Sequence, residues 1–180
     1  MLFRSMEIAQ IRSLIRDIPD YPTPGILFRD ITPLLRDGRA LSAVADLMAS
    51  KDHSAKLIAG IEARGFFFAA AIGVQSNRGV IPIRKKGKLP HLVYREEYGL
   101  EYGNDVIEIH KDAALPGEKV LLVDDVLATG GTLAAAIRLL QQTGATVSSI
   151  AVLLEIAALD GREKLAAQFP GLEINAIFTV

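Results

Sequence analysis

The sequence predicts a single-domain α/β fold, with a mostly parallel sheet flanked by helices. The chain has 180 residues, the usual size of one domain, and half of them are apolar, which allows a sizeable core. Short apolar runs alternate with segments of helical periodicity, as in repeated strand–helix units. The most informative unit is Lys119 to Thr132, KVLLVDDVLATGGT. Its order is buried strand, acidic pair, glycine-rich turn and helix start.

The N-terminal segment is expected to begin with an amphipathic helix. Isoleucines recur at near-helical spacing between Met6 and Ile18. Three prolines and a glycine then interrupt the pattern before the apolar triplet Ile26 to Phe28. Two interpretations of the triplet remain open. It is either a short buried strand or a lip on which a flat heterocycle stacks against Phe28.

The next elements form a second strand–turn–helix unit. A helix is expected over Leu41 to Met48 and a strand over Lys56 to Ile61, followed by the turn Glu62 to Gly65 and another helix. Arg64 stands at the start of that helix, where the helix dipole alone would repel a cation. A bound anion would stabilise it there. The alternative is a surface arginine paired with Glu62.

A strand over Gly79 to Arg84 leads into a run of cationic residues that includes Lys85 and Lys88. Such a run is often only a solvated face. Here it follows a strand end in an α/β pattern, where ligands gather. We therefore expect Lys85 and Lys88 to meet a highly charged anion such as pyrophosphate.

An antiparallel flap is predicted next. Leu92 to Tyr98 and Asp105 to His110 show strand-like alternation around a turn-rich segment, with Glu101 and Tyr102 at its tip. Glu101 is either a solvated turn carboxylate or a functional group carried on a loop tip.

The C-terminal part continues the strand–helix alternation. The expected elements are a helix over Leu133 to Gln142, a strand over Thr146 to Leu154, a helix over Gly161 to Gln168 and a strand over Glu173 to Val180. Gly144 suits the end of the first of these helices.

The central unit favours a ligand that combines a phosphate with a diol. Its turn consists of five small residues, Ala128, Thr129, Gly130, Gly131 and Thr132. Backbone N–H groups and the dipole of the following helix can attract an anion there. Asp124 and Asp125 would repel that anion, but they suit sugar hydroxyls or a Mg²⁺ ion that the sugar also touches. The alternative is an ordinary strand–helix unit with Asp125 on a surface turn. The P-loop and dinucleotide glycine signatures are absent.

Composition narrows the class of protein. The formal net charge is −1, which implies no general attraction to nucleic acid. The sequence has no cysteine, which suits a reducing cytosol, and its first twenty residues lack a secretory apolar region. The longest apolar run, Gly65 to Val74, is too short to span a bilayer. We therefore expect a cytoplasmic protein without nucleic-acid or membrane partners.

VLLVDDVLATGGT resembles the phosphoribosyl pyrophosphate (PRPP) loop of the type I phosphoribosyltransferases. Other stretches, spread over nearly the whole chain, resemble the adenine phosphoribosyltransferases of that family: PTPGILFRDITPLL (Pro22 to Leu35), EARGFFFA (Glu62 to Ala69), IRKKGKLP (Ile83 to Pro90), LEYG (Leu100 to Gly103) and GREKLA (Gly161 to Ala166). The loop indicates only the superfamily, whereas PGILFRDITP together with LEYG points to the adenine enzymes.

The resemblance implies an enzyme that converts adenine and PRPP to AMP and pyrophosphate. Asp124 and Asp125 would hold the ribose hydroxyls, and residues 128–132 would hold the 5′-phosphate. Mg²⁺, bound mainly through PRPP, would neutralise the leaving pyrophosphate together with three side chains, Arg64, Lys85 and Lys88. The flap would contribute Tyr102 to PRPP binding and Glu101 to proton transfer on adenine.

The resemblance also implies how adenine is bound. The backbone groups of Leu27 and Arg29 would read the edge of the base, and Phe28 and Ile156 would sandwich it. A cis peptide is expected between Glu62 and Ala63. An N-terminal helix and base-binding hood (1–35) would cover the phosphoribosyltransferase core (36–180), with the flap at 88–110. The resemblance also suggests a homodimer.

Three other functions compete with this one. A non-enzymatic PRPP-binding regulator would need a nucleic-acid-binding module, for which the residues before the proline-rich segment are too few. A receiver-like signalling domain would not need the ATGGT turn. A 6-oxopurine phosphoribosyltransferase uses a lysine near the end of the strand that follows the loop, whereas the only cation between Lys119 and Arg162 is Arg138.

Overall fold

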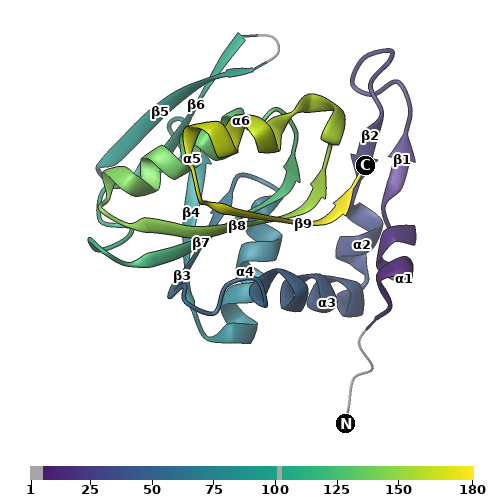
Figure 1. The fold of residues 1–180 in the computed structure, drawn as a ribbon, viewed down its shortest axis with the longest axis horizontal. Helices are drawn as coiled ribbons and strands as arrows, with labels where there is room; N and C mark the ends of the chain where they lie inside the picture. The colour runs from purple at the N-terminus through teal and green to yellow at the C-terminus, as the bar shows by residue number, and fades with distance from the viewer. Residues whose placement is uncertain (1–5, 101–102) are drawn as a thin grey trace.

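The computed structural model describes residues 6–100 and 103–180, and it confirms the predicted α/β fold (Figure 1). Strands and helices alternate along most of this part of the chain. In order, its elements are α1 (Ile8–Ser13), β1 (Arg16–Ile18), β2 (Phe28–Asp30), α2 (Thr32–Arg36), α3 (Gly38–Ala49), β3 (Leu57–Ile61), α4 (Gly65–Ser76), β4 (Gly79–Lys85), β5 (Val93–Leu100), β6 (Gly103–His110), β7 (Lys119–Leu127), α5 (Gly131–Gln142), β8 (Thr146–Glu155), the short 3₁₀ helix η1 (Ala157–Leu159), α6 (Gly161–Gln168) and β9 (Glu173–Thr179).

The main sheet of the described residues has seven strands in the order β5-β6-β4-β3-β7-β8-β9. β3 pairs in parallel with β4 and with β7, and β8 pairs in parallel with β7 and with β9. The carboxyl ends of these parallel strands therefore meet at one edge of the sheet, which is where ligands bind in open α/β sheets.

Helices cover both faces of the sheet (Figure 1). α5 buries seven apolar residues against one face, and α6 joins it there through Leu165. α3 and α4 pack on the other face, together with parts of α1 and α2. β7 lies between the two cores: Val120 and Leu122 belong to the first, and Leu121 and Val123 to the second. Burial on both faces explains its unbroken apolar run.

The predicted N-terminal helix was too long. α1 ends at Ser13, and Arg16–Ile18 form β1, which pairs antiparallel with β2. Two physical causes end the helix. Pro19 disfavours a helical conformation at the residue before it, and β2 supplies backbone partners for β1. The Asp30 side chain then fixes this two-stranded sheet, because its Oδ2 accepts from the Arg16 guanidinium at 2.5 Å and its Oδ1 from the Thr32 N–H at 2.9 Å.

The antiparallel flap is confirmed. β5 and β6 pair along their whole length, and β6 joins the main sheet through the pairs Arg84–Glu108 and Lys85–Ile107. The flap packs against α5, since Tyr98, Ile107 and Ile109 belong to the same core as the buried face of that helix (Figure 1). Glu101 and Tyr102, which the sequence placed at its tip, lie outside the described residues.

Asp52 links the connection after α3 to the distant strand β8. Its side chain is only 7% exposed. Oδ1 accepts hydrogen bonds from the N–H groups of Ser54 and Ala55 at 2.8 and 3.0 Å, and Oδ2 accepts from the hydroxyls of Ser148 and Ser149. Burial raises the pKa of Asp52, but the hydrogen bonds outweigh it and lower this pKa to about 2.

Asp52→Ala should lower the free energy of unfolding by about 2 kcal/mol at pH 7, because the buried donors lose their acceptor. The folded-state pKa lies below the unfolded value, so this contribution is complete above the unfolded pKa and is lost as the pH falls through about 2. Urea denaturation should therefore show a smaller difference between wild type and variant at pH 3 than at pH 7. The exposed Asp46→Ala serves as the control, and a pH-independent difference at Asp52 would contradict this role.

Candidate active site

The loop between β7 and α5 is held in a tight backbone cradle. Gly130 has a positive φ of 83°, and a Cβ there would lie 2.9 Å from the Gly161 carbonyl oxygen. A Cβ on Gly161 would in turn lie 2.1 Å from the Ala128 oxygen. The loop therefore packs directly on the start of α6, and both positions require glycine. Because Gly130 has no side chain to cap α5, the N–H groups of its first turn remain available to an anion.

The part of the flap next to its tip forms the other wall of this cradle. A Cβ on Gly131 would lie 3.3 Å from the Gly99 oxygen and 3.7 Å from the ring of Tyr98. Tyr98 is 8% exposed and hydrogen-bonds Thr132. Thr129 and Thr132 flank the cradle, with Thr129 exposed and Thr132 half-buried. The five small residues predicted to bind phosphate thus form one turn, packed between the start of α6 and the flap.

The acidic pair lies inside β7 rather than after it. Asp124 and Asp125 are 9% and 4% exposed, so the alternative of a surface-turn Asp125 is wrong. The Asp125 N–H donates to Asp124 Oδ1 at 2.9 Å. Burial, followed by the charge of Asp125, raises the pKa of Asp124 well above its usual value. Burial also raises the pKa of Asp125, against the opposing charge of Arg64.

Arg64 connects the acidic pair to the base-binding lip. Its Nη2 lies 2.9 Å from Asp125 Oδ2, and its guanidinium lies 5.1 Å from the centre of the Phe28 ring. The alternative pairing with Glu62 is wrong, because Glu62 pairs with Arg84 at 3.1 Å. The predicted cis peptide between Glu62 and Ala63 is confirmed.

The predicted lip is half-open to solvent. Phe28 is half-buried in β2 and packs edge-to-face against Tyr21 with ring centres 5.2 Å apart, while Leu27 is 45% exposed. Arg29 pairs with Asp17 at 2.5 Å. The Ile156 N–H donates to the Leu127 oxygen at 2.9 Å, which holds Ile156 beside the end of β7.

The two predicted lysines lie in different surroundings. Lys85 pairs with Asp105 at 3.0 Å, and its N–H donates to Glu62 Oε2 at 3.0 Å, beside the Glu62–Gly65 turn. Lys88 is exposed, and its carbonyl oxygen accepts from Arg84 at 3.1 Å. Asp105 was not predicted as a site residue. No pattern in the sequence marks it, because its approach to Lys85 depends on how the flap joins β4.

A second pair of residues was also not predicted from the sequence. Glu155 ends β8 just before Ile156, is 7% exposed, and pairs with Arg162 of α6. Arg162 also donates to the Ile174 oxygen of β9 at 2.7 Å. The GREKLA stretch that contains Arg162 was the available signal. The pair fixes the end of β8, next to Ile156 in the chain.

Metal-binding side chains are sparse around this edge. Among the described residues, no three or more His, Cys, Asp or Glu side chains gather as a metal site. Asp124 and Asp125 supply carboxylate oxygens, which suit Mg²⁺, but Arg64 already compensates one of them. These two residues therefore fit a metal that takes most of its ligands from substrate and water.

The candidate site lies apart from a groove in the N-terminal part of the chain. That groove, of about 1430 Å³, lies between α1, α2 and α3, and none of the candidate residues lines it. Within the part of the chain that the structure describes, no helix has both the length and the apolar character needed to cross a bilayer.

Asp124→Asn should raise the free energy of unfolding by about 1 kcal/mol at pH 7, because it removes a charge from a buried site and keeps the acceptor for the Asp125 N–H. The raised folded-state pKa means that wild type loses stability as the pH rises above the unfolded value. The gain of the variant should therefore be small at pH 4 and grow toward pH 8, as measured by urea denaturation. A loss of stability at pH 8 would show that the ionised form is stabilised in the folded protein.

Comparison with known proteins identifies the family. A family model described as uracil phosphoribosyltransferase matches residues 82–178, a range that includes the loop and the flap but not Phe28 or Arg64. Full-length relatives are more specific. The chain is 52% identical to the adenine phosphoribosyltransferase of Clavibacter michiganensis subsp. michiganensis (strain NCPPB 382), over 94% of this chain and 95% of that protein.

Solved structures agree with these relatives. The adenine phosphoribosyltransferase of Thermoanaerobacter pseudethanolicus is 44% identical, with a TM-score of 0.90 over 97% of this chain and 100% of that one. The enzyme of Giardia lamblia complexed with 9-deazaadenine is 38% identical, with a TM-score of 0.89 over 97% of this chain and 98% of that one. The chain belongs to the adenine phosphoribosyltransferase family.

Proposed function

We propose that the protein transfers a phosphoribosyl group from PRPP to adenine, giving AMP and pyrophosphate in purine salvage. One observation carries this proposal above all: Arg64 bridges the buried Asp125 beside the phosphate cradle to the Phe28 ring. A phosphate site, a diol site and an aromatic face thus lie in one connected series. Adenine and PRPP together require these three features.

The chemistry needs no nucleophile from the protein. The bond between C1′ of PRPP and the pyrophosphate oxygen breaks, and its electron pair leaves with pyrophosphate. The N9 nitrogen of adenine forms the new bond to C1′, and the base loses one proton. The protein contributes position and electrostatics around a cation-like ribosyl group. The carboxylates of Asp124 and Asp125 face that developing positive charge, and residues 128–132 hold the 5′-phosphate.

The remaining roles follow the family resemblance. Arg64, Lys85 and Lys88 neutralise the leaving pyrophosphate. Mg²⁺, held mainly through PRPP with Asp124 and Asp125 as candidate protein ligands, would supply further charge neutralisation there. On the flap, Tyr102 contacts PRPP and Glu101 handles the proton of the base.

Base selection depends on the lip, which reads the edge of the base, and on Arg138, which is unavailable to a 6-oxo group. The relative from Giardia lamblia binds 9-deazaadenine, an adenine analogue. In this chain the backbone groups of Leu27 and Arg29 read the edge of the base, between Phe28 and Ile156. Arg138 does not serve as a donor to a 6-oxo group, because it lies in α5 and pairs with Glu96 at 3.0 Å.

Steady-state assays with PRPP should show a strong preference for adenine over hypoxanthine and guanine, on the order of 10⁴-fold in kcat/KM. Buried polar groups that match an amino group are left unpaired by an oxygen, which is the physical reason. Comparable kcat/KM for hypoxanthine would favour the 6-oxopurine alternative. No AMP formation would favour the non-enzymatic PRPP-binding regulator.

The family resemblance also suggests a homodimer in the cytoplasm. α4 offers a surface for a second copy of the chain. Phe67 and Val74 are 51% and 85% exposed on this helix, and Val80 on β4 is 44% exposed beside it. Apolar side chains of this size are rarely left in water when they cluster on one face.

Val74→Glu should therefore shift the protein toward a monomer, because a carboxylate would be buried without a partner in the dimer. Sedimentation velocity over a range of protein concentrations measures the change. Leu115→Glu, at another exposed apolar residue, is the control. A wild type that is monomeric at micromolar concentration would refute the dimer.

A further inference from the structure

Three of the cations that border the proposed pyrophosphate site have a carboxylate partner within the protein. Lys85 stands out among them because its partner belongs to the flap rather than to the core. The three pairs are Arg64–Asp125 at 2.9 Å, Arg84–Glu62 at 3.1 Å and Lys85–Asp105 at 3.0 Å.

Asp105 is anchored independently of Lys85. Its Oδ1 accepts from the Val106 N–H at 2.8 Å, and its Oδ2 accepts from the Tyr98 hydroxyl at 3.3 Å. Tyr98 is itself packed against Gly131 of the phosphate cradle. The carboxylate therefore keeps its position when the lysine moves.

Lys85 is the movable partner. Its side chain is 56% exposed, whereas that of Asp105 is 24% exposed. Its backbone is fixed beside the Glu62–Gly65 turn by the hydrogen bond to Glu62. The ammonium group at the end of a flexible stem can therefore turn from Asp105 to an anion at that turn.

We infer that Asp105 competes with pyrophosphate for Lys85 and so weakens the binding of the leaving product. This inference rests on the proposed function, in which Lys85 meets pyrophosphate. Two effects act in the same direction: the carboxylate engages the ammonium group, and its own charge repels the anion. The hydrogen bond from Lys85, with other contacts, lowers the pKa of Asp105, so the carboxylate is charged at neutral pH. Weaker binding of pyrophosphate speeds its release, and product release limits the turnover of many enzymes.

Asp105→Asn tests the competition, because asparagine keeps the shape and an acceptor for Val106 while it removes the charge. The dissociation constant of inorganic pyrophosphate with Mg²⁺, measured by calorimetry, should fall about fivefold. The dissociation constant of AMP, which carries no pyrophosphate, should stay unchanged and also reports that the variant is folded. Asp105→Ser provides a second uncharged variant should the first fail to fold.

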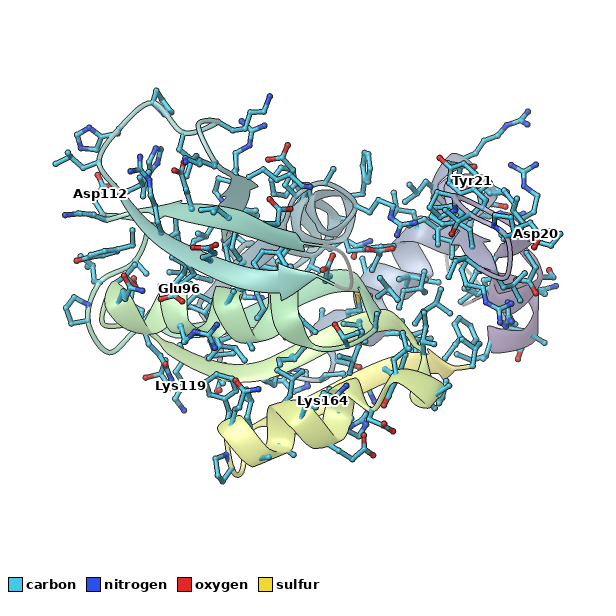
Figure 2. The ribbon with its side chains drawn as sticks, turned by 90° about the horizontal axis from the view of Figure 1, so that it is seen from above. Asp20, Tyr21, Glu96, Asp112, Lys119 and Lys164 are labelled. Carbon is cyan, nitrogen blue, oxygen red and sulfur yellow. The ribbon has the colours of Figure 1, made fainter. Side chains whose placement is uncertain are left out.

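A matched control lies on the same flap. Glu96 of β5 pairs with Arg138 at 3.0 Å and has a similar exposure, 21%. Figure 2 shows Glu96 above α5, at the opposite end of the molecule from Asp20 and Tyr21 of the hood. Glu96→Gln should leave the dissociation constants of pyrophosphate and AMP unchanged.

A double-mutant cycle assigns the effect to Lys85. In a Lys85→Ala background, Asp105→Asn should change pyrophosphate binding much less than in wild type. An equal effect in both backgrounds would overturn the competition, as would unchanged or weaker pyrophosphate binding in Asp105→Asn while wild type forms AMP. A wild type that forms no AMP would instead refute the proposed function.

Discussion

Two adjacent carboxylates buried at the end of β7 constrain the rest of the site. Asp124 and Asp125 are less than 10% exposed, and two charges at that depth are costly without compensation. Arg64 compensates Asp125 from the start of α4, and it reaches this carboxylate because α4 approaches β7 closely there. A Cβ on Gly65 would lie 2.9 Å from the Val123 oxygen and 3.0 Å from Asp124 Oδ1. The turn after β3 and the acidic end of β7 are therefore fixed by one another.

The same arginine extends this constraint to the N-terminal segment. Its guanidinium lies over the Phe28 ring, so a charge required by the core also orients the lip of the base site. The two-stranded sheet that carries Phe28 has few apolar contacts of its own. Ion pairs and side-chain hydrogen bonds hold it instead, from Asp30 to Arg16 and from Asp17 to Arg29. The position of Phe28 at the lip is thus set by electrostatics more than by packing.

The local sequence predicted the features that depend on interactions within a few residues. The apolar run of β7, the glycines of the cradle and the alternation of the flap each reflect burial or backbone geometry within a few residues, and the structure has them as expected. Partners distant in the chain were not predictable in this way. The pairs Arg64–Asp125 and Lys85–Asp105 form because β3 lies between β4 and β7 and because β6 joins β4. The end of α1 was predicted wrongly for the same reason, because β2 supplies backbone partners for Arg16–Ile18.

Charge pairing at the site has a consequence for how it distinguishes ligands. An uncompensated cluster of cations would attract any polyanion, substrate and product alike, which lowers KM without helping turnover. Here Arg64, Arg84 and Lys85 at the edge of the sheet are each matched by a carboxylate, and the chain as a whole carries a formal charge of −1. Attraction then depends on the backbone N–H groups of the cradle, which have a fixed geometry. Such a site selects an anion by the position of its phosphate rather than by its total charge.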